Sequence, residues 1–372
     1  MRDSSLDLTE VLWVGPENRG VYVGSPSIWK VAGRCYASHD FFGSTTIGDT
    51  VQVFVDETGM CAGSAATWRY AGNVSGMYWA NIFTLPKKDS ELYLLGVDSG
   101  DTATNRSIVL SRSDDGGASW SEPTSLLMGN TSSGKNYHCA PTPTLLSSRD
   151  GRLYRAFETG SESLVLRTRL PLDDTPDLLS SAAWEATNTV RLESSMIPAS
   201  WGPPLPGRKA WGWQEGNAIE LPDGGVANML RIDGQTVGTH NKAALLRVDP
   251  GEFSLHFGTM VDFPATTSKF VVRLEPRGGN ASLTVGTASP SDYSYYSLTT
   301  DVTPAAVTHG TVYARNHLVL AVSVGGLTNW SVCSTLLVDD TGLLSAVDSA
   351  RFTGSSQFPA ASHFWQSSPR PA

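Results

Sequence analysis

The sequence predicts an all-β protein in which small sheets of short strands repeat along one chain. Of its 372 residues, 36 are glycine and 21 are proline, which supplies many turns. Charged residues make up only 17% of the chain, a low share for a protein with exposed helices. No long run with the 3.6-residue periodicity of an amphipathic helix interrupts the short apolar segments. These observations together favour strands and turns throughout.

A turn signal followed by a strand-like run recurs along the chain, with starts about 45 to 75 residues apart. That spacing suits propeller blades of four short strands each, so the repeats predict a six-bladed β-propeller. We expect one domain over residues 1–354, with an incomplete last blade, and a disordered tail over 355–372, where strand alternation is lost. The repeated segments are 33–38, 91–95, 151–156, 225–230, 269–274 and 317–322.

The segment 113–120 reads Ser-Asp-Asp-Gly-Gly-Ala-Ser-Trp and follows the strand-like run 107–111. The carboxylate of Asp115 can accept hydrogen bonds from backbone N–H groups and so close a tight turn. A glycine permits positive φ in the loop, and Trp120 offers a large apolar group to pack beneath it. Degenerate versions of this segment end at Trp68, Trp184 and Trp330.

This segment resembles the Asp-box, or BNR repeat, of the sialidase (neuraminidase) superfamily. The resemblance implies a β-propeller scaffold in which such boxes lie at the periphery, so Asp115 and Trp120 are expected to be structural. It also implies a carbohydrate-active enzyme, a glycoside hydrolase.

The overall charge and the cysteines exclude several other classes of function. The formal net charge of −9 argues against a nucleic-acid binder that neutralises phosphates. No run approaches the length of a transmembrane helix and no secretory signal is visible, so membrane insertion is not expected and the compartment stays open. The four cysteines lie far apart without metal-binding spacing, and we expect buried thiols, no metal and no cofactor.

The sharpest candidate site lies in the segment 213–231, where two strand-like runs flank a Pro-Asp-Gly-Gly turn. Glu215 precedes the first run and Arg231 follows the second, so a hairpin would bring the two side chains together. A surface ion pair is the plain interpretation. The order and spacing also resemble the catalytic glutamate, turn and arginine of exo-sialidases. That resemblance implies that Glu215 polarises the nucleophile and that Arg231 binds a substrate carboxylate through its planar fork.

Other family positions are matched only in part. Arg315 is similar in position to a further carboxylate-binding arginine. The family's first arginine is absent, because the related Pro26-Ser27 lacks it, and no tyrosine follows Trp330 to act as the nucleophile. The acid/base aspartate would be Asp40 or Asp49.

A second group of residues suggests different chemistry. His39, His138 and Tyr137 lie in expected loops near the propeller centre, where Arg155 and Glu158 could join them. Histidine with tyrosine is suited to β-elimination from a uronic acid. Trp79 and Trp213 are candidate platforms for stacking on a sugar, with core packing as the alternative.

Three functions therefore stay open from the sequence. The first is a glycosidase that removes a terminal acidic sugar, sialic acid or a relative, from a glycan. The second is a lyase or hydrolase on uronic-acid glycans that uses the histidines and Tyr137. The third is a propeller that binds an acidic oligosaccharide without catalysis.

Overall fold

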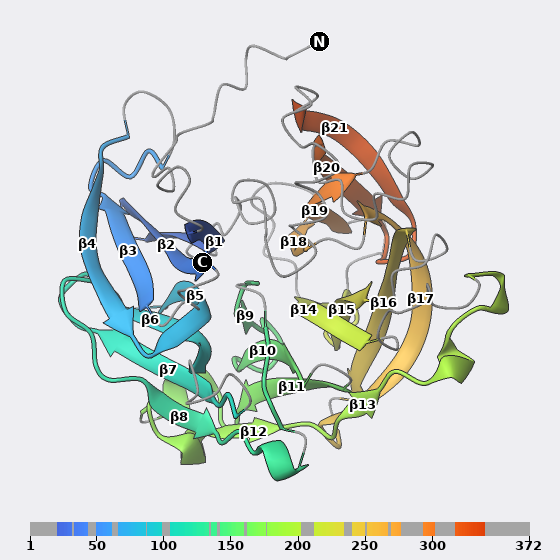
Figure 1. Cartoon of the computed structure of the whole chain (residues 1–372), viewed down its shortest axis with the longest axis horizontal. Coiled ribbons are helices and arrows are strands. Elements are labelled where there is room, and N and C mark those ends of the chain that lie inside the picture. Colours follow the sequence, from blue (N-terminus) through green and yellow to red (C-terminus); the bar gives the residue numbers. More distant parts are fainter. Residues whose placement is uncertain are drawn as a thin grey trace. The chain divides into compact units, whose positions relative to one another are not determined.

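The computed structural model describes most of the chain as strands joined by turns (Figure 1). The chain divides into two compact units, one containing β1 to β8 and the other β9 to β21. The described residues are 21–31, 33–43, 50–61, 66–86, 88–98, 105–133, 135–139, 142–159, 162–175, 177–201, 212–233, 240–249, 251–266, 269–276, 293–301 and 317–338.

The first unit holds two antiparallel sheets of four strands, each with its strands in chain order. The first strand of one sheet, β1, contacts the first strand of the other, β5. The strands of the first sheet are β1 (Val21–Val31), β2 (Arg34–Gly43), β3 (Thr50–Asp56) and β4 (Trp68–Ser75), and those of the second are β5 (Met77–Leu85), β6 (Lys88–Asp98), β7 (Ile108–Ser113) and β8 (Thr124–Leu127).

The second unit holds three antiparallel sheets, and neighbouring sheets touch through β10 and β14 and through β14 and β18. The third sheet has β9 (Leu145–Leu146), β10 (Leu153–Glu158), β11 (Glu162–Thr168) and β12 (Trp184–Ala186), with β13 (Val190–Arg191) also on β11. The fourth has β14 (Gly212–Glu220), β15 (Val226–Asp233), β16 (His240–Asp249) and β17 (Ser254–Thr266). The fifth has β18 (Val271–Pro276), β19 (Tyr293–Asp301), β20 (His317–Val324) and β21 (Trp330–Val338).

The described residues therefore form five sheets, and the expectation of six is wrong for this part of the chain. All six turn–strand segments do contain strands. The segments 269–274 and 317–322, however, fall in β18 and β20 of the same fifth sheet. The strands of the fifth sheet are joined by long connections. Two of its strands therefore lie as far apart in the sequence as strands of neighbouring sheets do elsewhere in the chain. The expected tail 355–372 lies outside the described residues.

The fourth sheet is buried on both faces, which is what fixes its position in the second unit. Alternate residues of a strand point to opposite faces. Accordingly, Leu230 and Ile232 of β15 join the core shared with the third sheet, whereas Ala227 and Met229 join the core shared with the fifth. A strand buried in this way tolerates few shifts in register.

The segment 113–120 forms a closed turn between β7 and β8. The Asp115 carboxylate accepts hydrogen bonds from the Ser119 N–H at 2.9 Å, the Ser119 hydroxyl at 2.5 Å and the Ser113 hydroxyl at 2.8 Å. The Trp120 indole N–H donates to the Gly117 carbonyl at 3.0 Å. These bonds lower the pKa of Asp115 to about 2, with the Ser119 hydroxyl as the largest cause.

Two of the degenerate segments repeat parts of this turn. The Asp56 carboxylate accepts the Thr67 N–H at 2.9 Å, next to Trp68. The Trp330 indole N–H donates to the Leu327 carbonyl at 2.8 Å, three residues back as in the first turn.

The cysteines differ from the four buried thiols expected. Cys35 and Cys61 form a disulfide, because β2 and the turn after β3 bring their Cα atoms to 5.3 Å. Cys139 and Cys333 lie outside this disulfide, the first buried and the second exposed. Within the described ranges no helix is long and apolar enough to span a membrane.

The turn at Asp115 predicts a dependence of stability on pH. A carboxyl whose folded pKa lies below its unfolded value of about 3.9 stabilises the fold above that value and loses this contribution as pH falls toward 2. Asp115→Asn should lower the thermal midpoint at pH 7 and weaken its fall between pH 4 and pH 2. The exposed Asp174 supplies the control, since Asp174→Asn should follow the wild-type profile. Parallel acid profiles for all three proteins would contradict this role.

Candidate functional site

Glu215 lies at a β-bulge near the start of β14, in a backbone conformation that only a few non-glycine residues adopt. Its φ is +60°, and the register between β14 and β15 shifts between Gln214 and Asn217. The bulge leaves the Glu215 side chain almost fully buried, at 2% exposure.

The Glu215 carboxylate lies between two cations. Its Oε2 is 2.9 Å from Nε of Arg231 on β15, and its Oε1 is 3.2 Å from Nζ of Lys269, just ahead of β18. The predicted proximity of Glu215 and Arg231 is thus confirmed, because the β14–β15 hairpin returns beside its own start. The roles drawn from the family resemblance stay predictions.

The third sheet holds the peptide that follows Glu215. The Gly216 N–H donates to Oε1 of the buried Glu158 at 2.6 Å, and the Gly216 carbonyl accepts the Thr142 hydroxyl at 2.8 Å. The buried Arg155 guanidinium in turn donates to the Thr142 hydroxyl oxygen. Glu158 therefore meets the candidate site directly at the Gly216 backbone, and Arg155 meets it through the Thr142 hydroxyl.

The fifth sheet holds the other side of the bulge through Asn217. Its Oδ1 accepts the Val272 N–H at 3.1 Å, and its Nδ2 donates to the Phe270 carbonyl at 3.2 Å. These bonds fix the start of β18 against β14. Lys269, directly before Phe270, is thereby placed within reach of Glu215.

The same local arrangement recurs on two first strands of the first unit. Ser25 on β1 has φ +51° and Trp79 on β5 has φ +54°, and each lies at a shift in strand register. Two residues after Ser25, the Ser27 hydroxyl oxygen accepts the Ile82 N–H of the next sheet at 3.0 Å. Likewise, two residues after Glu215, the Asn217 side-chain oxygen accepts the Val272 N–H of the next sheet.

The charges around Glu215 leave an excess of one cation. Arg155, Arg231 and Lys269 face Glu158 and Glu215 across this network, and all five side chains are buried. Buried charges are costly unless they are paired, and clusters of buried ionisable groups are enriched at functional sites, so this network is the candidate site of the second unit. No group of three potential metal-ligating residues occurs in the part of the chain that the structure describes.

Sequence reasoning missed Lys269, Asn217 and Thr142. The available signal was the repeated order of a variable residue, a small residue and Ser or Asn at 25–27, 79–81 and 215–217. Lys269 also stands out as a lysine that opens an apolar strand.

In the first unit, the predicted residues Asp40, Trp79 and His138 lie together. Oδ2 of the buried Asp40 accepts the Trp79 N–H at 2.6 Å. The His138 ring meets the Trp79 ring edge-on at 4.2 Å between centroids. The Arg106 guanidinium lies 5.0 Å from the same ring, a cation–π distance. Trp79 is therefore surrounded by protein groups on several sides.

His39 has different neighbours from His138. Because His39 and Asp40 are consecutive on β2, their side chains point to opposite faces, and His39 stacks on Phe54 at 5.4 Å. Burial lowers the pKa of His39 to about 4, so its imidazole is neutral at pH 7. Tyr137 is buried, which raises the pKa of its hydroxyl. The two histidine rings therefore contact different aromatic rings, those of Phe54 and Trp79.

Trp213 packs in the core and does not form an open platform for stacking on a sugar. It is fully buried, its indole N–H donates to the Val190 carbonyl at 2.8 Å, and its ring lies 6.3 Å from Phe257. The remaining candidates, Asp49 and Arg315, lie outside the described residues.

Comparison with known proteins places the fold. No protein-family model and no curated protein matches the sequence. The structure is similar to the NanB sialidase from Streptococcus pneumoniae, with a TM-score of 0.53 and 11% identity over 90% of this chain and 64% of NanB. It is similar to Trypanosoma rangeli sialidase, with a TM-score of 0.51 and 12% identity over 86% of this chain and 49% of that one.

A Penicillium chrysogenum alpha-L-arabinanase aligns at 12% identity over 83% of this chain and 80% of that one, with a TM-score of 0.48. The likeness to the two sialidases shows an all-β propeller fold. The chain spans less than two thirds of the length of either sialidase.

The packing at Gly216 predicts that even one methyl group is not tolerated there. A Cβ would lie 2.4 Å from Asn228 Oδ1 and 2.9 Å from Ala156 Cβ. Gly216→Ala should therefore lower the free energy of unfolding by about 1–3 kcal/mol in urea denaturation. Gly326→Ala is the control, because a Cβ at Gly326 meets nothing within 4 Å. Equal stability of the two variants would contradict the close approach of β10 to the bulge.

Proposed function

We propose that this protein is a glycoside hydrolase that removes a terminal acidic sugar, sialic acid or a relative, from a glycan. The observation that carries the proposal is a buried carboxylate, Glu215, held at a backbone bulge between Arg231 and Lys269. Its propeller fold, shared with two sialidases, supports the same class of substrate.

The local excess of positive charge suits an anionic sugar. Arg231 carries five N–H donors in a planar fork, and its ion pair with Glu215 is made through Nε. A substrate carboxylate can be bound by such a fork in a bidentate manner, and Lys269 adds a second cation nearby. Both cations lie in a largely water-excluded region, where their attraction for an anion is stronger than at the surface.

Glu215 is the group proposed to take part in the reaction. Its position is set by β14, β15 and the start of β18 together, so its carboxylate has a fixed direction. A carboxylate in a fixed place can polarise an attacking hydroxyl or accept its proton. By the family resemblance, Glu215 would do this for the nucleophile.

A non-catalytic glycan-binding propeller is the second candidate. It is favoured by the contact of each Glu215 oxygen with a cation, an arrangement that also builds a binding site without chemistry. The two histidines that a uronic-acid lyase would use contact different rings, His39 that of Phe54 and His138 that of Trp79.

A digest of an acidic-glycan library, read by mass spectrometry and followed with a fluorogenic sialoside, tests the proposal. Wild type should release a terminal acidic sugar, and Glu215→Gln should lower kcat/KM by about 100-fold or more. The exposed Glu193 gives the matched control, and Glu193→Gln should stay close to wild type.

Two results would count against this function. Full activity of Glu215→Gln would remove Glu215 from the reaction. Binding of acidic glycans without release of any product would favour the non-catalytic alternative.

A further inference from the structure

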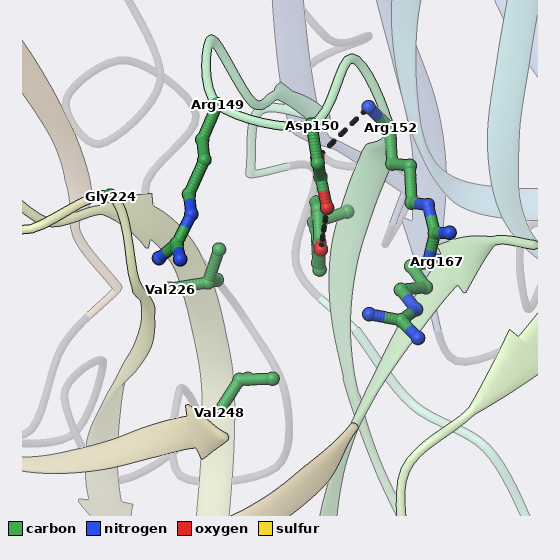
Figure 2. A pocket seen from close by; sticks show the side chains of 8 residues that line it. Arg149, Asp150, Arg152, Arg167, Gly224, Val226 and Val248 are labelled. Carbon is green, nitrogen blue, oxygen red and sulfur yellow. Dashed lines mark hydrogen bonds between the residues drawn. The ribbon is translucent and has the colours of Figure 1, made fainter. Parts of the chain in front are cut away.

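A charged cavity lies in the same unit as Glu215, between the third and fourth sheets. Its volume is about 220 Å³. The turn before β10, strands β10 and β11, and the ends of β15 and β16 enclose it, and Figure 2 shows arginine side chains on either side of Asp150. The lining residues are Arg149, Asp150, Arg152, Tyr154, Arg167, Gly224, Val226 and Val248.

The lining is strongly cationic, with three arginines against one carboxylate. Arg149 is exposed, and its guanidinium makes one long hydrogen bond, 3.5 Å to the Asp223 carbonyl. Nε of Arg152 is buried and has no hydrogen-bond partner. The nearest carboxylate to the Arg152 guanidinium is Glu185, at 3.9 Å from Nη1. Both arginines therefore keep hydrogen-bonding capacity for a ligand.

The other lining groups are held in place. Arg167 donates to Glu185 at 2.8 Å and lies 3.7 Å from the centre of the Phe253 ring. The Tyr154 hydroxyl donates to Asp150 at 2.6 Å, and burial, followed by this bond, raises the pKa of Tyr154 to about 12. Asp150 also accepts the Arg152 backbone N–H at 3.1 Å, so each of its carboxylate oxygens receives a hydrogen bond from the protein.

The cavity is separate from the Glu215 site. Along β15, Val226 pairs with Glu220, whereas Arg231 pairs with Gln214. Val226 lines the cavity and Arg231 contacts Glu215, so the two sites lie at opposite ends of the strand. Arg231 lies five positions after Val226 on the strand, a distance of about 17 Å.

We propose that this cavity binds a small oxyanion, the carboxylate of an acidic sugar or a free sulfate or phosphate ion. Guanidinium groups meet the paired oxygens of such anions with two parallel hydrogen bonds. The volume is below the usual range for drug-sized ligands and suits a small anion with a few waters. This binding does not depend on the proposed hydrolase activity.

Isothermal titration calorimetry on the whole chain tests the site, with sodium sulfate, sodium phosphate and sodium glucuronate each titrated against sodium chloride of equal ionic strength. We expect saturable binding of at least one of the three oxyanions. Arg149→Gln should weaken that binding by about tenfold or more, since it removes a charged donor. Arg191→Gln, at an exposed arginine away from the cavity, should leave it unchanged.

Arg152→Gln provides a second variant, and circular dichroism verifies that each variant is folded. Tighter binding of glucuronate identifies a sugar acid as the ligand, and tighter binding of sulfate or phosphate identifies the free ion. Unchanged binding in Glu215→Gln supports a separate site, whatever becomes of catalysis. Absence of saturable binding, or equal binding by wild type and both cavity variants, would overturn the proposal.

Discussion

The left-handed backbone at Glu215 is the constraint on which the candidate site depends. A non-glycine residue at φ +60° costs on the order of 1–3 kcal/mol and persists only where the surroundings hold it. Here Glu158 of the third sheet and Thr142, just before that sheet, hold Gly216, and Asn217 holds the fifth sheet. The bulge therefore couples three sheets, and its outcome is a buried carboxylate that meets cations from two of them.

The same device appears on β1 and β5, where Ser25 and Trp79 also have positive φ at a shift in register. In the first unit, the strain at Trp79 accompanies a hydrogen bond to Asp40 and contacts with His138 and Arg106. Ser27 and Asn217 each bond the backbone of a following sheet. One local conformation thus serves both to join sheets and to display side chains at the start of a strand.

Local features were predictable from the sequence. The hairpin 213–231 and the closed turn at Asp115 depend on residues close in the chain, where turn chemistry and strand alternation are strong signals. Contacts between sheets were not predictable in this way. Lys269, just ahead of β18, reaches Glu215 on β14 only after the fourth and fifth sheets have packed. The disulfide lies within the first sheet and the turn after β3, but it joins residues 26 apart in the chain. The number of sheets was misjudged for a related reason, because spacing along the chain cannot tell a long connection within the fifth sheet from a step to a new one.

A double-mutant cycle between Glu215 and Lys269 tests most directly whether the bulge ties the fourth and fifth sheets. Free energies of unfolding would be measured in urea for Glu215→Gln, Lys269→Met and the double variant. A direct ion pair between buried groups predicts a coupling energy of about 1 kcal/mol or more. Additive effects, to within about 0.3–0.5 kcal/mol, would show that the two residues do not interact and would contradict the account.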